Sequence, residues 1–156
     1  MRIGKDFGLM GQVIIDYSHG HHIEIGDNVI LAPRVHILAH DTSTKLYLGY
    51  TRIGKVKIGN RVFVGAGTII LPGVSIGDDV IIGAGSVVSR DIPARTVAGG
   101  NPARVICSLD EFLDKRRKEF AASPCFGEEY TRPEYLTMPI MASMNQAMKD
   151  RIGFIV

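Results

Sequence analysis

The residues best suited to proton transfer in this chain are five histidines, all within its first 40 residues: His19, His21, His22, His36 and His40. An unperturbed imidazole titrates near neutral pH, which suits it to general acid–base chemistry. His40 directly precedes a long irregular segment and is the candidate base. The other interpretation is a hydrogen-bonded histidine in a turn.

His19, His21 and His22 form a dense cluster within four residues. A metal site needs two or three imidazoles that converge on one point. A polar loop, or the lining of an acceptor pocket, explains the same residues without a metal. We predict no metal site in this chain, since it has no paired-cysteine motif and no histidine after His40.

The elements that must position these side chains are visible as a repeat. From Ile58 to Pro93 the chain reads IGNRVF, VGAGTI, ILPGVS, IGDDVI, IGAGSV and VSRDIP. Every hexad begins with Ile or Val, and similar hexads return after eighteen residues. A period of six fits an α-helix poorly, and Gly, Asn and Asp between the aliphatic residues indicate frequent corners. We therefore predict an all-β fold, a parallel β-helix with three short strands in each coil.

The eighteen-residue period also predicts the register of the coils. Ile58 should lie over Ile76, Val64 over Ile82 and Ile70 over Val88. Two earlier coils begin at Ile3 and Ile25, and the register is interrupted at 21–24 and at 43–57. Loops that interrupt a solenoid tend to gather on one side and to carry binding function.

The column that contains His40 holds Ser18, Gly73 and Asp91 in the other coils. Gly73 has no side chain, so we expect an open slot beside His40. Asp16 and Tyr17 should lie on the same side one coil earlier, and Asp41 follows His40. These three residues are candidates to bind an acceptor, although turn chemistry explains Asp16 equally well.

Two GAG segments, 65–67 and 83–85, are predicted to stack on each other. Without bulky side chains, their backbone groups can approach an extended ligand. Tight corners need the same small residues, so this pattern alone is weak.

The bulk properties limit the function. The chain has 156 residues and a net charge of +2, which indicates neither a nucleic-acid partner nor a membrane surface. With no signal peptide and no long apolar run, we expect a cytoplasmic protein. Cys107 and Cys125 are expected to be free thiols.

The hexad pattern ends near residue 106, and we divide the chain into a β-helix domain, 1–106, and a C-terminal helix and tail, 107–156. Ser108 and Glu111 form a capping box for a helix that ends near Ala122. A second helix is expected over about 142–151. The apolar end, 153–156, must pack against the helix or a neighbouring subunit.

The stretch IGDNVILAPRVHILAHD, a loop, and then KIGNRVFVGAGTIILPGVSIGDDVIIGAGSVVSRDIPARTVAGGNPARVI closely resemble the hexapeptide-repeat acetyltransferases. The similarity is greatest to their sugar O-acetyltransferase branch and covers about residues 10–106. It implies a left-handed coil and a homotrimer, with acetyl-CoA and a sugar acceptor bound in clefts between subunits.

The resemblance also implies roles for individual residues. His40 matches the catalytic histidine, and Asp16 lies near an acceptor-binding aspartate. The positions that match the cofactor site are Phe63, Ala66, Gly67, Ala84, Gly85, Ser89, Arg90 and Arg104. Of these, Phe63 would flank the pantetheine arm, and Arg104 would lie beside the adenosine phosphate.

We therefore expect an acyltransferase that acetylates a sugar hydroxyl, in capsule, exopolysaccharide or related glycan biosynthesis. An antibiotic or amino-sugar acetyltransferase of the same fold is the alternative enzyme. A γ-carbonic anhydrase would need zinc histidines downstream, and a non-catalytic solenoid would not need His40, the GAG turns and Arg104 together.

Overall fold

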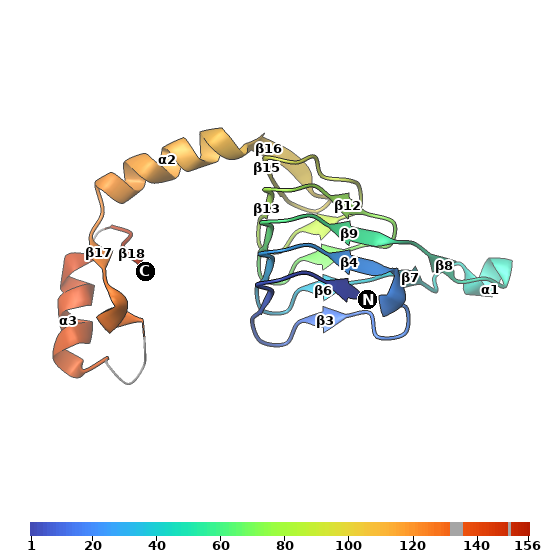
Figure 1. Cartoon of the computed structure of the whole chain (residues 1–156), viewed down its shortest axis with the longest axis horizontal. Coiled ribbons are helices and arrows are strands. Elements are labelled where there is room, and N and C mark those ends of the chain that lie inside the picture. Colours follow the sequence, from blue (N-terminus) through green and yellow to red (C-terminus); the bar gives the residue numbers. More distant parts are fainter. Residues whose placement is uncertain (132–135, 150) are drawn as a thin grey trace. The chain divides into compact units, whose positions relative to one another are not determined.

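The computed structural model describes residues 1–131, 136–149 and 151–156. The chain forms two compact units, Met1–Asp110 and Glu111–Val156. In the first unit, two- and three-residue strands stack into a parallel β-helix with three faces (Figure 1). The first face contains β1 (Arg2–Ile3), β4 (Ile23–Ile25), β9 (Val56–Ile58) and β12 (Ser75–Ile76).

The chain then turns onto the second face and the third. The second face contains β2 (Gly8–Leu9), β5 (Ile30–Leu31), β10 (Phe63–Val64), β13 (Ile81–Ile82), β15 (Thr96–Gly99) and the antiparallel β16 (Arg104–Ser108). The third face contains β3 (Ile14–Ile15), β6 (His36–Ile37), β11 (Ile69–Ile70) and β14 (Val87–Val88). We call the turns between faces the first corner (first to second face), the second corner (second to third) and the third corner (third face to the next coil).

The predicted register is confirmed. Ile58 pairs with Ile76, Val64 with Ile82 and Ile70 with Val88. The two earlier coils continue the same columns. One aliphatic side chain from each strand enters the prism, and those of Ile23, Leu31 and Ile70 are fully buried. Each such side chain contributes about 1.5–3 kcal/mol by burial.

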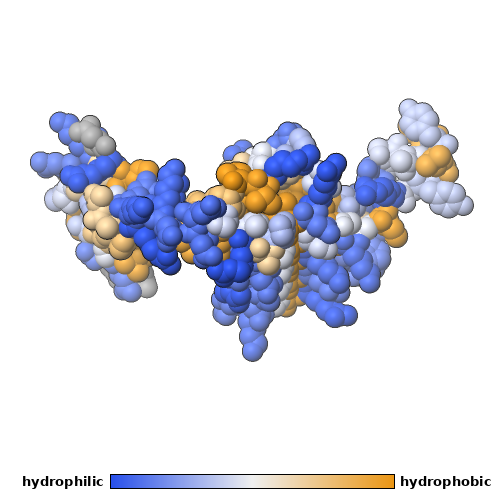
Figure 2. Space-filling view, turned by 90° about the horizontal axis from the view of Figure 1, so that it is seen from above, coloured by the Kyte–Doolittle hydropathy of each residue, from blue (hydrophilic) through white to orange (hydrophobic). Residues whose placement is uncertain are grey.

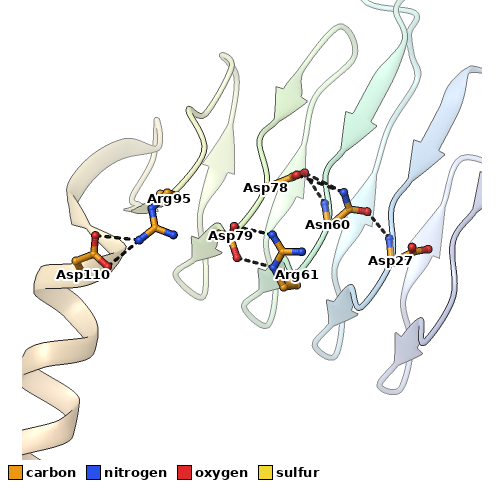
Figure 3. A network of polar contacts seen from close by, with 7 residues as sticks. All are labelled: Asp27, Asn60, Arg61, Asp78, Asp79, Arg95 and Asp110. Atoms are coloured by element: carbon orange, nitrogen blue, oxygen red, sulfur yellow. Dashed lines mark hydrogen bonds and ion pairs between the residues drawn. The ribbon is translucent and has the colours of Figure 1, made fainter.

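Polar side chains fix the first corner (Figure 3). The side chain of Asp27 accepts a hydrogen bond from the amide of Lys5, that of Asn60 from Asp27, and that of Asp78 from Asn60, at 2.7–2.9 Å. Each corner thus satisfies a backbone amide of the adjacent coil, which would otherwise be left without a partner.

A second row at the same corner consists of ion pairs. Arg61 makes a bidentate pair with Asp79, and Arg95 pairs with Asp110 (Figure 3). Both arginine side chains are more than half exposed, so these pairs contribute little to stability.

Both interruptions of the repeat lie at the third corner, so the loops gather on one side as expected. They contain η1 (Gly20–His22) and a hairpin arm formed by β7 (His40–Asp41), α1 (Lys45–Leu48) and β8 (Arg52–Ile53). We expected the two interruptions to end at residues 24 and 57, but both end two residues earlier. Ile23 and Val56 already pair in the sheet, because Ile23–Ile25 and Val56–Ile58 alternate buried and outward side chains as strands do.

The arm extends from the β-helix and exposes hydrophobic side chains, as Figure 2 shows at the right of the view. Leu46 and Tyr47 are 92% and 85% exposed. No helix within the described residues is long and apolar enough to cross a membrane.

The helix α2 (Leu109–Ala121) begins directly after Ser108, as its capping box predicts, and all of it from Glu111 onward belongs to the second unit. This unit also contains β17 (Cys125–Phe126), η2 (Glu128–Tyr130), α3 (Met138–Ala147) and β18 (Phe154–Ile155). The apolar end packs within this unit, since β18 pairs with β17 and the Phe154 ring lies edge-on to Phe120 at 5.1 Å.

The predicted bounds of the second helix, 142–151, were wrong. It begins four residues earlier, because Pro139 lies in its first turn, where the missing N–H of proline costs nothing. It ends at Ala147, and residue 150 lies outside the described residues.

Replacement of Gly65 tests the packing of the coils. A Cβ atom there would lie 2.4 Å from the amide nitrogen of Ala84 in the next coil. We expect Gly65→Ala to lower the free energy of unfolding by about 1–3 kcal/mol or more, because backbone rather than a flexible side chain must move. Gly8→Ala is the matched control, since its Cβ would meet Ile30 at an ordinary 3.6 Å. Urea unfolding that gives equal stabilities for both variants would contradict this account.

Candidate active site

The candidate site lies at the third corner, where Asp16 follows β3 in the first coil and His40 begins β7 in the second. The Asp16 side chain is buried, and its Oδ2 accepts a hydrogen bond from Nδ1 of His40. The His40 side chain is 32% exposed. An imidazole held from one side and open on the other is a suitable arrangement for a base.

Both oxygens of the Asp16 carboxylate accept hydrogen bonds. Oδ1 accepts hydrogen bonds from the amides of Ser18 and His19 and from the Ser18 hydroxyl, at 3.0–3.1 Å. Oδ2 also accepts from the Ala39 amide at 2.9 Å. Burial raises the pKa of Asp16, but the hydrogen bonds from His40, Ala39 and the 18–19 turn outweigh it and bring this pKa well below its usual range.

The ionised carboxylate decides the tautomer of His40. Because a carboxylate without a proton can only accept, Nδ1 of His40 must carry the hydrogen. Nε2 therefore keeps its lone pair and can take a proton from another group. This arrangement differs from the sequence-based expectation for Asp16, because its buried oxygens serve His40 rather than an acceptor.

The side-chain position of Gly73 is open as expected, since a Cβ atom there would meet, within the described part of the chain, nothing closer than a guanidinium nitrogen of Arg52 at 3.9 Å. Gly54, directly after β8, stacks on the Gly73 backbone, and a Cβ atom on Gly54 would lie 2.5 Å from the Gly73 amide nitrogen. The Gly54 amide donates to the carbonyl oxygen of Ala39 at 3.0 Å. The hairpin arm, whose course the sequence pattern did not predict, places Arg52 at the edge of this space.

A cleft of about 410 Å³ remains beside His40 and is lined by Leu38, His40, Asp41, Thr42, Arg52, Leu71 and Pro72. Asp41 accepts from the Ser43 amide, and this hydrogen bond lowers the pKa of its carboxyl. Arg52 lines the cleft because it pairs with Asp41 across the hairpin. No sequence pattern indicated this residue. Tyr17 is 97% exposed and lines a separate depression with Met1 and His21.

The GAG turns lie at the second corner, so one chain does not bring them to His40. Within the described chain, the amides of Gly65, Gly67, Gly83 and Gly85 all donate to carbonyl oxygens of the corners and neighbouring coils, whereas no such acceptor meets those of Ala66 and Ala84. Among the described residues, these two are the turn amides without a backbone acceptor.

The other predicted cofactor residues are spread along the coil. Phe63 is on the outward side of β10 and is 41% exposed. Ser89 and Arg90 follow β14 on the surface of the third corner, and Arg104 begins β16, with its guanidinium on the carbonyl oxygen of Ala103. Phe63 and Arg104 thus lie on the second face, which leads into the corner of the two alanines, whereas Ser89 and Arg90 lie at the third corner.

Comparison with known proteins identifies the family. Residues 55–90 match the model described as bacterial transferase hexapeptide (six repeats). The crystal structure of a maltose O-acetyltransferase from Clostridium difficile 630 is 40% identical in sequence, with a TM-score of 0.58, over 69% of this chain and 68% of that one. The chain belongs to the hexapeptide-repeat acetyltransferase family.

Two further members of this family are similar over the same region. A hexapeptide-repeat acetyltransferase of Vibrio cholerae O1 biovar eltor, complexed with acetyl coenzyme A, is 30% identical with a TM-score of 0.61 over 69% of this chain and 60% of that one. The galactoside O-acetyltransferase of Escherichia coli K12 is 40% identical over 71% of this chain and 55% of its own length. The chain spans between about half and two thirds of the length of the first curated relatives it matches.

Family membership confirms the resemblance found in the sequence and implies that the coil is left-handed. In other parallel folds the crossovers are almost always right-handed, so the hand is a property of these repeats.

The pKa of Asp16 predicts how the site responds to acid. The native pKa lies below the unfolded value of about 3.9, so the unfolded chain binds the proton first and the stabilisation by Asp16 is lost as pH falls below about 4. We expect wild type to be more stable than Asp16→Asn at pH 7, and the difference to shrink at pH 3.5 and below. Urea unfolding of both proteins across this range measures it, and a difference independent of pH would contradict the assignment.

Proposed function

We propose that this protein is an acetyl-CoA-dependent O-acetyltransferase that acts on a sugar hydroxyl. The observation that carries the proposal is the buried Asp16 carboxylate on Nδ1 of His40, which leaves Nε2 free at the edge of a cleft. The relatives that are named maltose and galactoside O-acetyltransferases support a sugar acceptor. A structure of the family with acetyl coenzyme A supports the donor.

In the proposed reaction, Nε2 of His40 takes the proton of the acceptor hydroxyl while its oxygen attacks the thioester carbonyl. The new C–O bond gives a tetrahedral oxyanion, and its collapse breaks the C–S bond. The leaving thiolate of CoA recovers the proton from His40. Asp16 positions the imidazole and stabilises its positive charge while it carries that proton.

The free amides of Ala66 and Ala84 are the groups we assign to the pantetheine arm of the donor, next to Gly67 and Gly85. An amide there donates a hydrogen bond to a ligand without loss of any coil contact. Phe63, Ser89, Arg90 and Arg104 would contact the remainder of the cofactor. Asp41, at the edge of the His40 cleft, is the candidate that remains for the acceptor.

We further propose a homotrimer. His40 lies at the third corner and the GAG turns at the second, so a cleft between two subunits would bring both to one acetyl-CoA molecule. A closed three-fold arrangement gives every subunit the same pair of surfaces. We assign the protein to the cytoplasm and to capsule, exopolysaccharide or related glycan biosynthesis; the free thiols of Cys107 and Cys125 agree with a reducing compartment.

The role of His40 is tested by His40→Ala. We expect a loss of about 10²–10⁴-fold in acetyl transfer, because loss of a general base has effects of that size, with nearly unchanged affinity for CoA. Asp16→Asn should lower kcat and leave CoA affinity unchanged. His36→Ala is the matched control, since this side chain lies on the third face with Nδ1 3.0 Å from the carbonyl oxygen of Arg34. A screen of sugars and nucleotide-sugars for CoA release provides the assay, and activity of His40→Ala within a few-fold of wild type would refute the proposal.

Arg104 tests the cofactor site. Its guanidinium would pair with the 3′-phosphate of CoA, and a charge-assisted hydrogen bond contributes about 1.5–3 kcal/mol. We expect Arg104→Ala to weaken CoA at least tenfold and 3′-dephospho-CoA little. Arg61→Ala, which removes a guanidinium at the first corner, should change neither affinity. Calorimetry with both cofactors gives the answer, and light scattering gives the subunit number. Equal losses for both cofactors, or a fully active monomer, would contradict the proposal.

A further inference from the structure

The third corner contains more imidazole than the proposed reaction uses. The His19 ring lies 4.6 Å from that of His40, centroid to centroid. His21 and His22 lie beyond it, with centroids 6.1 and 6.3 Å from His19. Two imidazoles, those of His40 and His19, thus lie beside the buried carboxylate of Asp16, and two more lie beyond His19.

The hydrogen bonds of this cluster decide which nitrogen of each ring is free. Nδ1 of His40 donates to Asp16, as described above. The Ser18 hydroxyl gives its one hydrogen to Oδ1 of Asp16, and Nδ1 of His19 lies 2.8 Å from that hydroxyl oxygen. In the tautomer that the site proposed below requires, this oxygen accepts from Nδ1–H of His19. Both rings consequently keep the lone pair on Nε2.

This pattern is the one that metal-binding histidines show. Such a histidine nearly always donates its other ring N–H to a carboxylate or another oxygen, which fixes the ring and makes the free nitrogen a better ligand. Here His40 is held by Asp16 directly, and His19 is held through Ser18. A polar loop requires no such arrangement behind its imidazoles.

We propose that Nε2 of His19 and Nε2 of His40 bind a borderline transition-metal ion such as Zn²⁺, with water at the remaining positions and Asp16 behind the ligands. Through the proposed function of His40, on which this part rests, the bound ion inhibits acetyl transfer, because it occupies the lone pair that accepts the hydroxyl proton. The reaction itself needs no metal, and the proposed site departs from the sequence-based prediction that this chain has no metal site.

The geometry is compatible with this site. One potential ligand atom from each of Asp16, His19 and His40 lies within 4.8 Å of the other two. Two nitrogens at about 2.0–2.1 Å from one zinc ion lie roughly 3.3 Å apart, so the two rings, whose centroids are 4.6 Å apart, must rotate to bring their Nε2 atoms to that distance. The two imidazoles are about one-third exposed, at 31% and 32%, which leaves room for that rotation.

Zinc titration of the untagged, chelator-treated full chain by calorimetry tests the site. We expect one ion per chain, and Kd raised at least tenfold in His19→Ala and in His40→Ala. Asp16→Asn should raise Kd about 10–100-fold, as loss of a carboxylate behind a metal ligand does. His36→Ala, outside the cluster, should bind as wild type. Absence of zinc binding by wild type, or wild-type affinity in His19→Ala, would overturn the proposal.

Inhibition is measured separately on the same proteins. Acetyl transfer by wild type should fall as Zn²⁺ is added and return with a chelator, and His19→Ala should need at least tenfold more Zn²⁺ for the same inhibition. Equal sensitivity of both proteins would refute the link to His40. If wild type transfers no acetyl group, the proposed function fails, while the zinc titration still decides whether the site exists.

Discussion

The β-helix depends on backbone hydrogen bonds between coils, since no strand in the coils from residue 2 to residue 88 is longer than three residues. Such strands cannot persist alone, and each is stable only because the strand above or below supplies its donors and acceptors. The amides of Gly26, Gly59 and Gly77, for example, donate to Ile58, Ile76 and Ile92 at 2.9 Å. Everything at the corners is therefore placed by the rise of the coils rather than by local preference.

Asp16 makes the same kind of hydrogen bond between coils that recurs at the first corner, and it makes a second interaction in addition. At the first corner, the side chains of Asp27, Asn60 and Asp78 each accept from a backbone amide of the adjacent coil. Asp16 does the same at the third corner with the amide of Ala39. Its second interaction, with Nδ1 of His40, joins this structural role to the candidate base. A substitution of Asp16 should consequently affect both stability and the orientation of His40.

The repeat made the fold predictable and the site only partly so. Ile58, Val64 and Ile70 repeat with a fixed period, and that period determines their partners. The turn that buries Asp16 and the arm that places Gly54 over Gly73 have no repeat, so their course depends on tertiary contacts that the sequence pattern does not encode. The GAG turns show a related limit. Gly67 and Gly85 have positive φ angles of 69° and 68°, but Arg34 adopts φ 61° at the equivalent corner, so backbone conformation alone does not demand glycine there.

The placement of both interruptions at one corner makes chain length variable there and almost nowhere else in the coil. Removal of one residue from a strand would turn its buried aliphatic side chain outward and shift every later column. A change in the arm between β7 and β8 leaves the columns in place, because Ile23 and Val56 resume the register. Doubling a flexible loop costs only about 0.6 kcal/mol in closure entropy. Selection can therefore lengthen, shorten or replace the segment beside His40 while the rest of the coil keeps its sequence.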